Sequence, residues 1–329
     1  MVSMKDIAEA CKVSVSTVSR ALNGVHGISA PQVALIRQTA RRMGYIPNEV
    51  ARTLKTSRSW IIAVLYDASL THPFFSILLD AIRTEAEACG YDLIFLSRKG
   101  RNGKDYSDSA LCRATDGVVI VYVDAESLSP EKLMASGIPV VSVDDCNRNC
   151  PLVVSDYRQG TRELVRLAVS RGHRRIALVH GEMAYAAQER IQGFREEMKA
   201  SGLSVPAEYI RAGHYQNGAS AAEQIRFLLK LPEPPTCILL PDDTSADGAL
   251  RLLRADGLEC PRDFSCLGYD GTVVNLPDSL PLTTYQQDFE GIAREVVRLL
   301  LSLTDHAEPP RKDTLIRGRI LEGNTLAEI

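Results

Sequence analysis

Three short helix beginnings stand close together in the first 45 residues of this chain. Each has an apolar residue, a serine, and a second apolar residue four positions after the serine: Val2-Ser3…Ile7, Val13-Ser14…Val18 and Ile28-Ser29…Val33. The serine can accept a hydrogen bond from a free backbone N–H, and the apolar pair has the spacing of a hydrophobic staple. Gln32 completes the sequence pattern of a capping box in the third start. The pattern predicts helices near residues 4–11, 15–22 and 30–43.

The break at Cys11-Lys12-Val13 is short enough for the turn of a helix-turn-helix. The second helix is then the recognition helix, and its first residues enter the major groove of DNA. We expect its exposed positions to be Val15, Ser16, Thr17, Ser19 and Arg20. We expect its other face to pack on the first and third helices, with Val18, Ala21 and Leu22 against Ile7, Ala8, Leu35 and Ile36.

The charge of this segment separates two interpretations of the three helices. Helix caps alone favour a small helical cap of no further function. Residues 1–60, however, hold nine Lys and Arg against three Asp and Glu, whereas the rest of the chain holds 29 against 38. A basic patch is the electrostatic signature of phosphate binding, so a DNA-binding headpiece over residues 1–47 is favoured.

Three runs of this segment resemble the headpiece of the lactose/galactose-repressor (LacI/GalR) family of bacterial regulators. They are Met4-Lys5-Asp6-Ile7-Ala8, the run from Val13 to Asn23, and Gly44-Tyr45-Ile46-Pro47-Asn48. The resemblance implies that Val15, Ser16 and Arg20 reach base edges. It also implies that Ser14, Thr17, Ser19 and Asn23 hold phosphates.

Residues 48–59 have helical composition but are too few for a stable isolated helix in water. They resemble the hinge helix of the same family, which folds when two copies pair over DNA. In that interpretation Leu54 is an apolar wedge in the minor groove, and Arg52 and Lys55 contact the backbone or the groove floor. The alternative is a polar linker with one isolated leucine.

Residues 60–329 alternate short β-branched runs with longer helical stretches. The predicted strands are Ile61–Tyr66, Asp92–Leu96, Val118–Val123, Val140–Val143, Leu152–Val154, Ile176–Val179, Cys237–Leu240 and Ser265–Gly268. The predicted helices are Phe75–Cys89, Gln159–Arg171, Ala187–Ser201, Gly218–Leu229, Ser245–Asp256 and Phe289–Leu303. This alternation predicts an α/β core with parallel sheets and crossover helices on both faces.

The core resembles periplasmic-binding-protein-like domains, which implies two doubly wound parallel-sheet subdomains joined by three crossings. An N-subdomain is expected at about 60–158 plus 288–320, and a C-subdomain at about 159–287. The crossings are expected near 157–160, 285–288 and in a final strand at 314–320. Ligands of such sheets bind beyond the carboxyl ends of the strands.

Two charged residues follow predicted strands of the C-subdomain and are the main candidates for an effector site. Arg190 lies early in a helix after one strand, and Asp270 lies just past another. A guanidinium and a carboxylate can together bind hydroxyls or a planar polar ligand through charge-assisted hydrogen bonds. Taken singly, each is more often a partner in a surface salt bridge, but the family resemblance places an effector-binding arginine and aspartate at these positions.

Six further positions are candidate effector contacts with less support: Asp67, Phe74, Asp144, Tyr215, Asp242 and Gln287. Tyr215 resembles an aromatic residue that stacks on ligands in the family, although core packing is nearly as good an explanation for the aromatic residues. His72 stands where a family Asn-Pro-Phe-Phe stretch has asparagine. Asp242 also stands where asparagine is usual, which changes the hydrogen bonds offered to a ligand.

Several classes of protein lack support in the sequence. There is no signal-peptide-like stretch and no run of about 18 apolar residues, so we expect a cytoplasmic protein without a membrane partner. The eight cysteines form no Cys-x-x-Cys pair, which favours reduced, buried thiols and no metal site. No nucleophile elbow, zinc-protease motif, phosphate loop or dinucleotide fingerprint is present, so we expect neither an enzyme nor a cofactor.

The sequence therefore predicts a homodimeric, ligand-controlled transcriptional regulator that binds an inverted-repeat operator in double-stranded DNA. A repressor controlled by a sugar or sugar derivative is favoured. The alternatives are a nucleobase-type corepressor, a sugar-processing enzyme with a fused DNA-binding domain, and an architectural DNA binder without a ligand.

Overall fold

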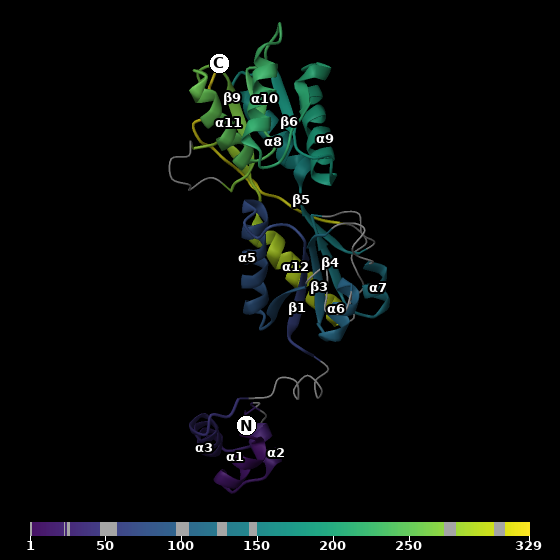
Figure 1. Ribbon diagram of the computed structural model, residues 1–329, viewed down its shortest axis with the longest axis vertical. Helices are drawn as coiled ribbons and strands as arrows, with labels where there is room; N and C mark the ends of the chain where they lie inside the picture. Colours follow the sequence, from purple (N-terminus) through teal and green to yellow (C-terminus); the bar gives the residue numbers. More distant parts are fainter. Residues whose placement is uncertain are drawn as a thin grey trace. The chain divides into compact units, whose positions relative to one another are not determined.

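The computed structural model describes residues 2–22, 24, 27–46, 58–96, 105–123, 130–144, 150–272, 281–305 and 313–329. Two compact units account for the chain, Met1–Ser59 and Trp60–Ile329. Each unit is described by itself (Figure 1). Most of the predicted hinge, including Arg52, Leu54 and Lys55, lies outside the described residues, as does Asn23.

The first unit is a bundle of three helices, α1 (Met4–Cys11), α2 (Val15–Leu22) and α3 (Ala30–Arg42). The three helix starts predicted from the serine pattern are all present. A small core holds the bundle together, built from Ile7, Ala8, Val18, Ala21, Ile36 and Ala40. Because Val18 and Ala21 point inward, the opposite side of α2 is left at the surface.

Two details of this unit differ from the prediction. Ser29 precedes α3 but makes no side-chain cap hydrogen bond, whereas Ser3 and Asp6 form a reciprocal capping box at α1. Asp6, three residues after Ser3, reaches back to the backbone as a glutamate does in a capping box. The sequence pattern therefore predicted the capping box at α3, whereas it is found at α1. Leu35, expected in the core, is 51% exposed, because the 3.6-residue period of α3 turns Ile36 inward instead.

The N-subdomain is a six-stranded parallel sheet with helices on both faces. Its order is β11-β5-β4-β3-β1-β2, formed by Thr314–Ile316, Leu152–Ser155, Val140–Val143, Gly117–Tyr122, Ile61–Tyr66 and Asp92–Leu96. One face carries α5 (Pro73–Ala88) and α12 (Phe289–Thr304), and the other carries α6 (Tyr106–Cys112) and α7 (Pro130–Ala135). Sheets covered on both faces need strands that are apolar throughout, as Ile61–Tyr66 is.

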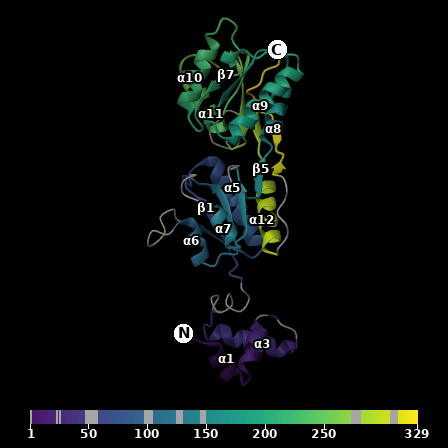
Figure 2. The ribbon, with the colours of Figure 1, turned by 90° about the vertical axis from the view of Figure 1, so that its right-hand side faces the viewer.

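The C-subdomain repeats this plan (Figures 1 and 2). Its order is β12-β10-β9-β8-β6-β7, formed by Arg319–Leu321, Thr284–Gln286, Ser265–Asp270, Cys237–Leu239, Ile176–His180 and Ile210–Ala212. One face carries α8 (Tyr157–Ser170) and α9 (Tyr185–Ala200), and the other carries α10 (Gly218–Leu229) and α11 (Asp243–Ala255). The two doubly wound parallel sheets are the fold class that the sequence predicts; only β12 runs antiparallel to its neighbour.

The chain passes between the subdomains three times, and the third crossing corrects the predicted boundary. A single strand was expected over 314–320 in the N-subdomain. Instead β11 pairs with β5 in the first sheet, and β12 pairs with β10 in the second. The switch occurs at Gly318, where a Cβ atom would lie 2.0 Å from the backbone oxygen of Gln286. Only glycine permits this close approach, so the N-subdomain ends before residue 319.

The cysteines are less uniformly buried than the sequence suggested. Cys237 and Cys266 are buried, but Cys89 and Cys112 are exposed at helix ends, where apolar neighbours in the sequence turn to the other face. Among the described residues, no helix combines the length and apolar character that a membrane crossing requires.

Candidate functional site

The first residues of α2 form a polar edge on the headpiece. Ser14 accepts a hydrogen bond from the Thr17 backbone N–H at 3.1 Å, and its hydroxyl lies 2.8 Å from that of Thr17 and 2.7 Å from that of Ser16. Val15 is 45% exposed although it is apolar. The amino-terminal end of a helix carries a partial positive charge and unpaired N–H groups, which suit a phosphate.

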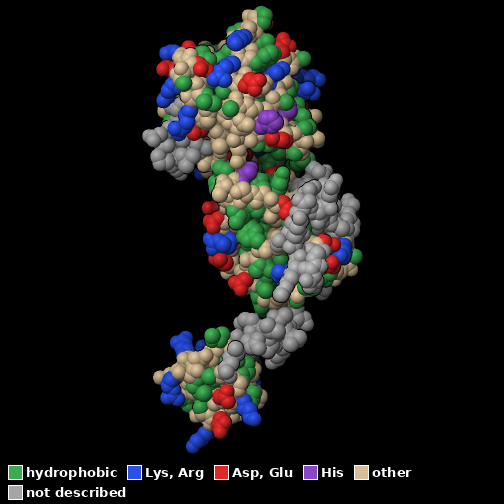
Figure 3. Space-filling view, in the orientation of Figure 1, with side chains coloured by type: hydrophobic (Ala, Val, Ile, Leu, Met, Phe, Trp, Pro, Cys, Tyr) green, Lys and Arg blue, Asp and Glu red, His purple; other side chains and the backbone are tan. Residues whose placement is uncertain are grey.

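The headpiece also carries exposed basic side chains. Arg20 is exposed on α2, and Arg37, Arg41 and Arg42 are exposed on α3. Figure 3 shows Lys and Arg side chains on several sides of the headpiece. The structure thus leaves Ser14, Val15, Ser16 and Arg20 at the surface, with Thr17 and Ser19 half-buried beside them.

In the core, Arg190 is the centre of a buried polar cluster. It extends from α9, with its side chain only 8% exposed. Its guanidinium donates to the backbone oxygen of Pro241 at 2.6 Å and to Asp270 at 3.4 Å. The guanidinium carbon lies 3.6 Å from the ring centroid of Tyr269, with the rings of Tyr157 and Tyr215 further out at 4.9 and 5.9 Å. Three aromatic faces and one carboxylate therefore hold the arginine in place.

Asp270 ends β9 in a strained backbone conformation, with a φ of +99°. Gln287, from the crossing into α12, donates to its carboxylate at 2.7 Å. Burial raises the pKa of Asp270 to about 6, although the nearby Arg190 acts in the opposite direction. Left-handed backbone at a non-glycine residue is uncommon and is concentrated at functional sites. Arg190, Asp270 and Gln287, predicted from separate segments, are in direct contact.

The N-subdomain supplies two aspartates on strand ends. Asp144 follows β4, also with a positive φ of +62°, and accepts a hydrogen bond from the hydroxyl of Tyr157. Tyr157 also contacts Arg190, so Asp144 is linked to the cluster through one side chain. Asp67 follows β1 and accepts from the hydroxyl of Tyr106.

Two of the predicted effector contacts, Asp242 and Phe74, stabilise the fold. Asp242 caps α11 by accepting from the backbone N–H of Ser245 at 2.8 Å, and it also accepts from the N–H of Gln216 at 2.8 Å. Phe74 is buried in the N-subdomain core, with its ring 5.4 Å from that of Phe289. For Phe74 the structure shows the packing that the sequence left as an alternative.

Tyr215 lies over Gly181, where a Cβ atom would come within 2.4 Å of the tyrosine ring. It lines a small cavity of about 10 Å³ together with Arg190, Tyr269 and Thr161. This volume accommodates about one water molecule, whereas a small-molecule site has several hundred Å³. Every residue that lines this cavity belongs to the C-subdomain, so it is an interior space of that subdomain beside Arg190.

Three buried polar atoms of this cluster have no hydrogen-bond partner among the described residues. They are Nε of Arg190, the hydroxyl of Tyr215 and Oε1 of Gln287. Buried polar groups normally have partners, so these atoms are the hydrogen-bonding capacity that the cluster can offer to a ligand.

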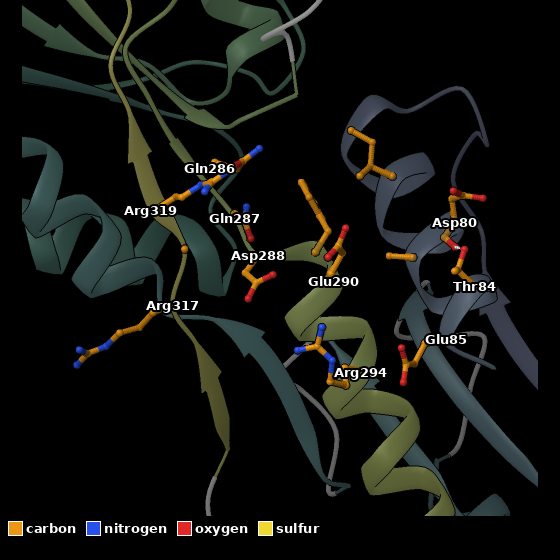
Figure 4. A pocket seen from close by; sticks show the side chains of 14 residues that line it. Asp80, Thr84, Glu85, Gln286, Gln287, Asp288, Glu290, Arg294, Arg317 and Arg319 are labelled. Atoms are coloured by element: carbon orange, nitrogen blue, oxygen red, sulfur yellow. Dashed lines mark hydrogen bonds between the residues drawn. The ribbon is translucent and has the colours of Figure 1, made fainter. Parts of the chain in front are cut away.

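A larger cavity of about 880 Å³ lies beside the crossings (Figure 4). One wall is α5, with Asp80 and Glu85, and the other walls come from the crossing residues 286–290 and 317–319. Gln287 lines this cavity and also contacts Asp270, so it connects the crossing to the buried cluster.

Sequence reasoning missed several residues of the cluster. Tyr157 and Tyr269 cage Arg190, and Glu182 holds the loop that carries Tyr215 by accepting its backbone N–H at 3.0 Å. Tyr269 stands directly before Asp270 at a strand end, which was an available signal. Nothing in the local sequence distinguishes Glu182 from a surface glutamate.

Comparison with known proteins gives a consistent result. Residues 3–48 match the model of "Bacterial regulatory proteins, lacI family", and residues 140–326 match that of the "Periplasmic binding protein-like domain". The chain is 28% identical to the HTH-type transcriptional repressor PurR of Vibrio cholerae, covering 100% of this chain and 99% of that protein. It is 29% identical to the HTH-type transcriptional repressor CytR of Escherichia coli K12, covering 91% and 89%.

Among solved structures, the lac repressor dimer bound to operator and the anti-inducer ONPF is similar, with a TM-score of 0.81 and 26% identity. The similarity covers 99% of both chains. All three proteins are named as repressors. With its lacI-type headpiece and its periplasmic-binding-protein-like core, this chain belongs to the LacI family of bacterial regulatory proteins.

Proposed function

We propose that this protein is a cytoplasmic transcriptional repressor that binds an inverted-repeat operator as a homodimer and is controlled by a small polar effector. The observation that carries the proposal is the combination of two features in one chain. A basic headpiece presents the start of α2 to solvent, and a separate core holds a caged arginine and aspartate at strand ends. An enzyme needs no such headpiece, and a purely architectural DNA binder needs no such cluster.

On DNA, the exposed side of α2 enters the major groove. Val15, Ser16 and Arg20 contact base edges, and Ser14, Thr17 and Ser19 contact phosphates. Asn23, Arg52, Leu54 and Lys55 lie outside the described residues, and their DNA contacts remain predictions from the resemblance.

In the core, the effector lies between the subdomains against Arg190 and Asp270, with Tyr215, Gln287 and Asp144 beside it. Asp67 and Asp242 contribute more remotely. Carboxylates accept hydrogen bonds from hydroxyl groups, and the unpartnered Nε of Arg190 donates one, which fits a sugar or sugar derivative. An effector of this kind acts through its different affinities for the open and closed arrangements of the two subdomains.

The DNA half of the proposal is tested by selecting binding sites from random duplexes. We expect an inverted repeat and an affinity that falls steeply with salt, because bound phosphates release counterions. Arg20→Ala should lose about 1–3 kcal/mol on the selected site and relax base preference, whereas Thr17→Ala should weaken binding to all sequences alike. Sites without dyad symmetry would refute the dimeric operator complex.

The effector half is tested by a thermal-shift screen of sugars, sugar derivatives and nucleobases. We expect stabilisation by a sugar-class compound and a change in operator affinity when that compound is added. Stabilisation by nucleobases alone would show that the effector is a nucleobase and not a sugar, and it would leave the proposed DNA-binding function unaffected. Turnover of any compound would favour the enzyme alternative.

A further inference from the structure

His72 and Gln216 meet across the cleft between the two subdomains. His72 precedes α5 of the N-subdomain, and Gln216 lies in the loop between β7 and α10 of the C-subdomain. Nε2 of Gln216 lies 2.7 Å from Nδ1 of His72, and both side chains are part-buried. An amide nitrogen can only donate, so Nδ1 accepts and the imidazole is neutral with its proton on Nε2.

The His72 side chain is free for this contact because it does not cap its own helix. It occupies the N-cap position of α5 without a side-chain cap hydrogen bond. Its ring packs on that of Phe75, with centroids 4.6 Å apart. Its backbone begins the helix in the ordinary way, since the His72 carbonyl accepts from the N–H of Ser76 at 2.8 Å.

Gln216 is held in a strained conformation that presents its side chain to the cleft. Its φ is +54°, in the left-handed region. The backbone N–H groups of Gln216 and Asn217 are fixed by Asp242 at 2.8 Å and by Ser245 at 3.1 Å. A strained backbone persists only where its surroundings over-determine it, as these side chains of α11 do.

The loop is clamped from its other side as well. The N–H of Tyr215 donates to Glu182 at 3.0 Å, and the Ser245 hydroxyl donates to the carbonyl of His214 at 3.3 Å. The loop that carries Gln216 therefore moves with the C-subdomain as a rigid part.

We propose that His72 and Gln216 form a latch that holds the effector cleft closed, and that they are positioning residues for effector binding. The latch is a side-chain contact between the two subdomains, in addition to the three backbone crossings. The inference rests on the proposed effector function, because a ligand that binds between the subdomains must find the cleft open to reach Arg190, whose side chain is only 8% exposed. Breaking the latch favours the open arrangement.

The test needs no effector. Gln216→Asn keeps an amide and a residue type that tolerates a positive φ, but it shortens the side chain by one methylene so that it no longer reaches His72. Gln192→Asn is the matched control, since Gln192 donates to Glu196 within α9 and makes no contact across the cleft that the structure describes. His72→Asn removes the partner from the other side.

The first readout is the imidazole pKa, measured by NMR on full-length protein with labelled histidine. The signal of His72 is assigned as the one of the six histidine signals that is lost in His72→Asn. In the wild type, burial lowers the pKa of His72 below its ordinary value, with Asp242 acting against it. In Gln216→Asn the pKa should move back up, because the open cleft exposes the ring to water. In Gln192→Asn it should stay where it is.

The second readout is hydrogen exchange of the backbone amides at residues 214–217. One hydrogen bond corresponds to roughly a two- to tenfold change in the opening equilibrium, so exchange should be faster by that factor in either latch variant. The double variant should be no faster than the single ones, because both remove the same contact.

An unchanged His72 pKa together with unchanged exchange in Gln216→Asn would overturn the latch. Additive effects of the two substitutions would also overturn it, since they would show independent roles. Failure of the effector proposal is distinguishable, because it is seen in the compound screen and leaves these ligand-free measurements unaffected.

Discussion

At the scale of single residues, the carboxyl group of Asp243 is the clearest case of a side chain altered by its surroundings. It is fully buried at the start of α11, and burial raises its pKa to about 8. The hydroxyl of Thr284 donates to it at 2.6 Å and the backbone N–H of Thr272 at 2.8 Å. Neither donor compensates for the desolvation of a full charge, so the neutral form is favoured.

This pKa makes a prediction for stability. The folded-state pKa lies above the ordinary value of 3.8, so Asp243 stabilises the fold most at low pH and this contribution is lost as pH rises through about 8. Asp243→Asn mimics the neutral form. We expect the stability of the wild type to fall relative to this variant from about pH 4, where the unfolded carboxyl group ionises, to about pH 8, and the difference to stay constant above that. A constant difference between pH 6 and 9, measured by calorimetry, would contradict this.

A second prediction at this scale concerns Arg190 and Asp270. Removing one partner of a desolvated charge-assisted contact costs about 2–5 kcal/mol, so Arg190→Ala and Asp270→Ala should each weaken effector binding more than tenfold. Operator binding without effector should persist, because the headpiece is a separate unit. Calorimetry with the compound from the screen measures the affinity. Arg251→Ala is the control, since Arg251 pairs with Asp247 on the surface of α11. Wild-type affinity in Arg190→Ala would show that the effector binds elsewhere.

At the scale of elements, α8 and α9 are joined by ion pairs of unequal burial. Glu197, with its side chain 7% exposed, accepts from Arg162 at 3.0 Å and from Arg166 at 2.8 Å. The neighbouring residue, Glu196, pairs with Arg158 at the surface. Surface pairs contribute about 0–1 kcal/mol, whereas a buried carboxylate between two arginines contributes more.

Glu197 and Glu196 allow the stability contributions of a buried and an exposed ion pair to be compared in the same helix. Glu197→Gln should lower the free energy of unfolding by about 1–3 kcal/mol, less than for a fully buried pair because both arginines are part-exposed to solvent. Glu196→Gln should lower it by less than about 1 kcal/mol. Urea unfolding measures both. Equal effects would show that burial of Glu197 is not what gives the contact its strength.

At the scale of the whole molecule, two headpieces must come together to read an inverted repeat. We expect the homodimer to use surfaces of the core such as α5, where Ile77 is 38% exposed beside Asp80. Ile77→Glu places a charge in that surface and should raise the dimer dissociation constant at least tenfold. Light scattering across a concentration series measures it. A monomeric wild type would contradict the homodimer. An unaffected dimer in Ile77→Glu would show that the interface does not include this part of α5.

Much of the fold could be predicted because local signals and tertiary packing agree. The strands Ile61–Tyr66 and Val140–Val143 and the helix Gly218–Leu229 have the predicted bounds. Apolar runs that are buried on both faces leave little freedom in where a parallel strand begins or ends. Helices α6 and α7 and strand β7 were missed, since short elements have weak periodicity and depend on the sheet that they contact.

The headpiece, the alternation of strands and helices, and the strand-end positions of Arg190 and Asp270 were all determined by the sequence alone, because each depends on residues near one another in the chain. Only the tertiary structure decided which side chains from distant segments contact one another. The tyrosine cage comes from three separate elements, and the change of sheet at Gly318 depends on the backbone of Gln286. The contact of His72 with Gln216 joins residues 144 positions apart. Local propensity carries no information about such distances, which the packing of two sheets fixes.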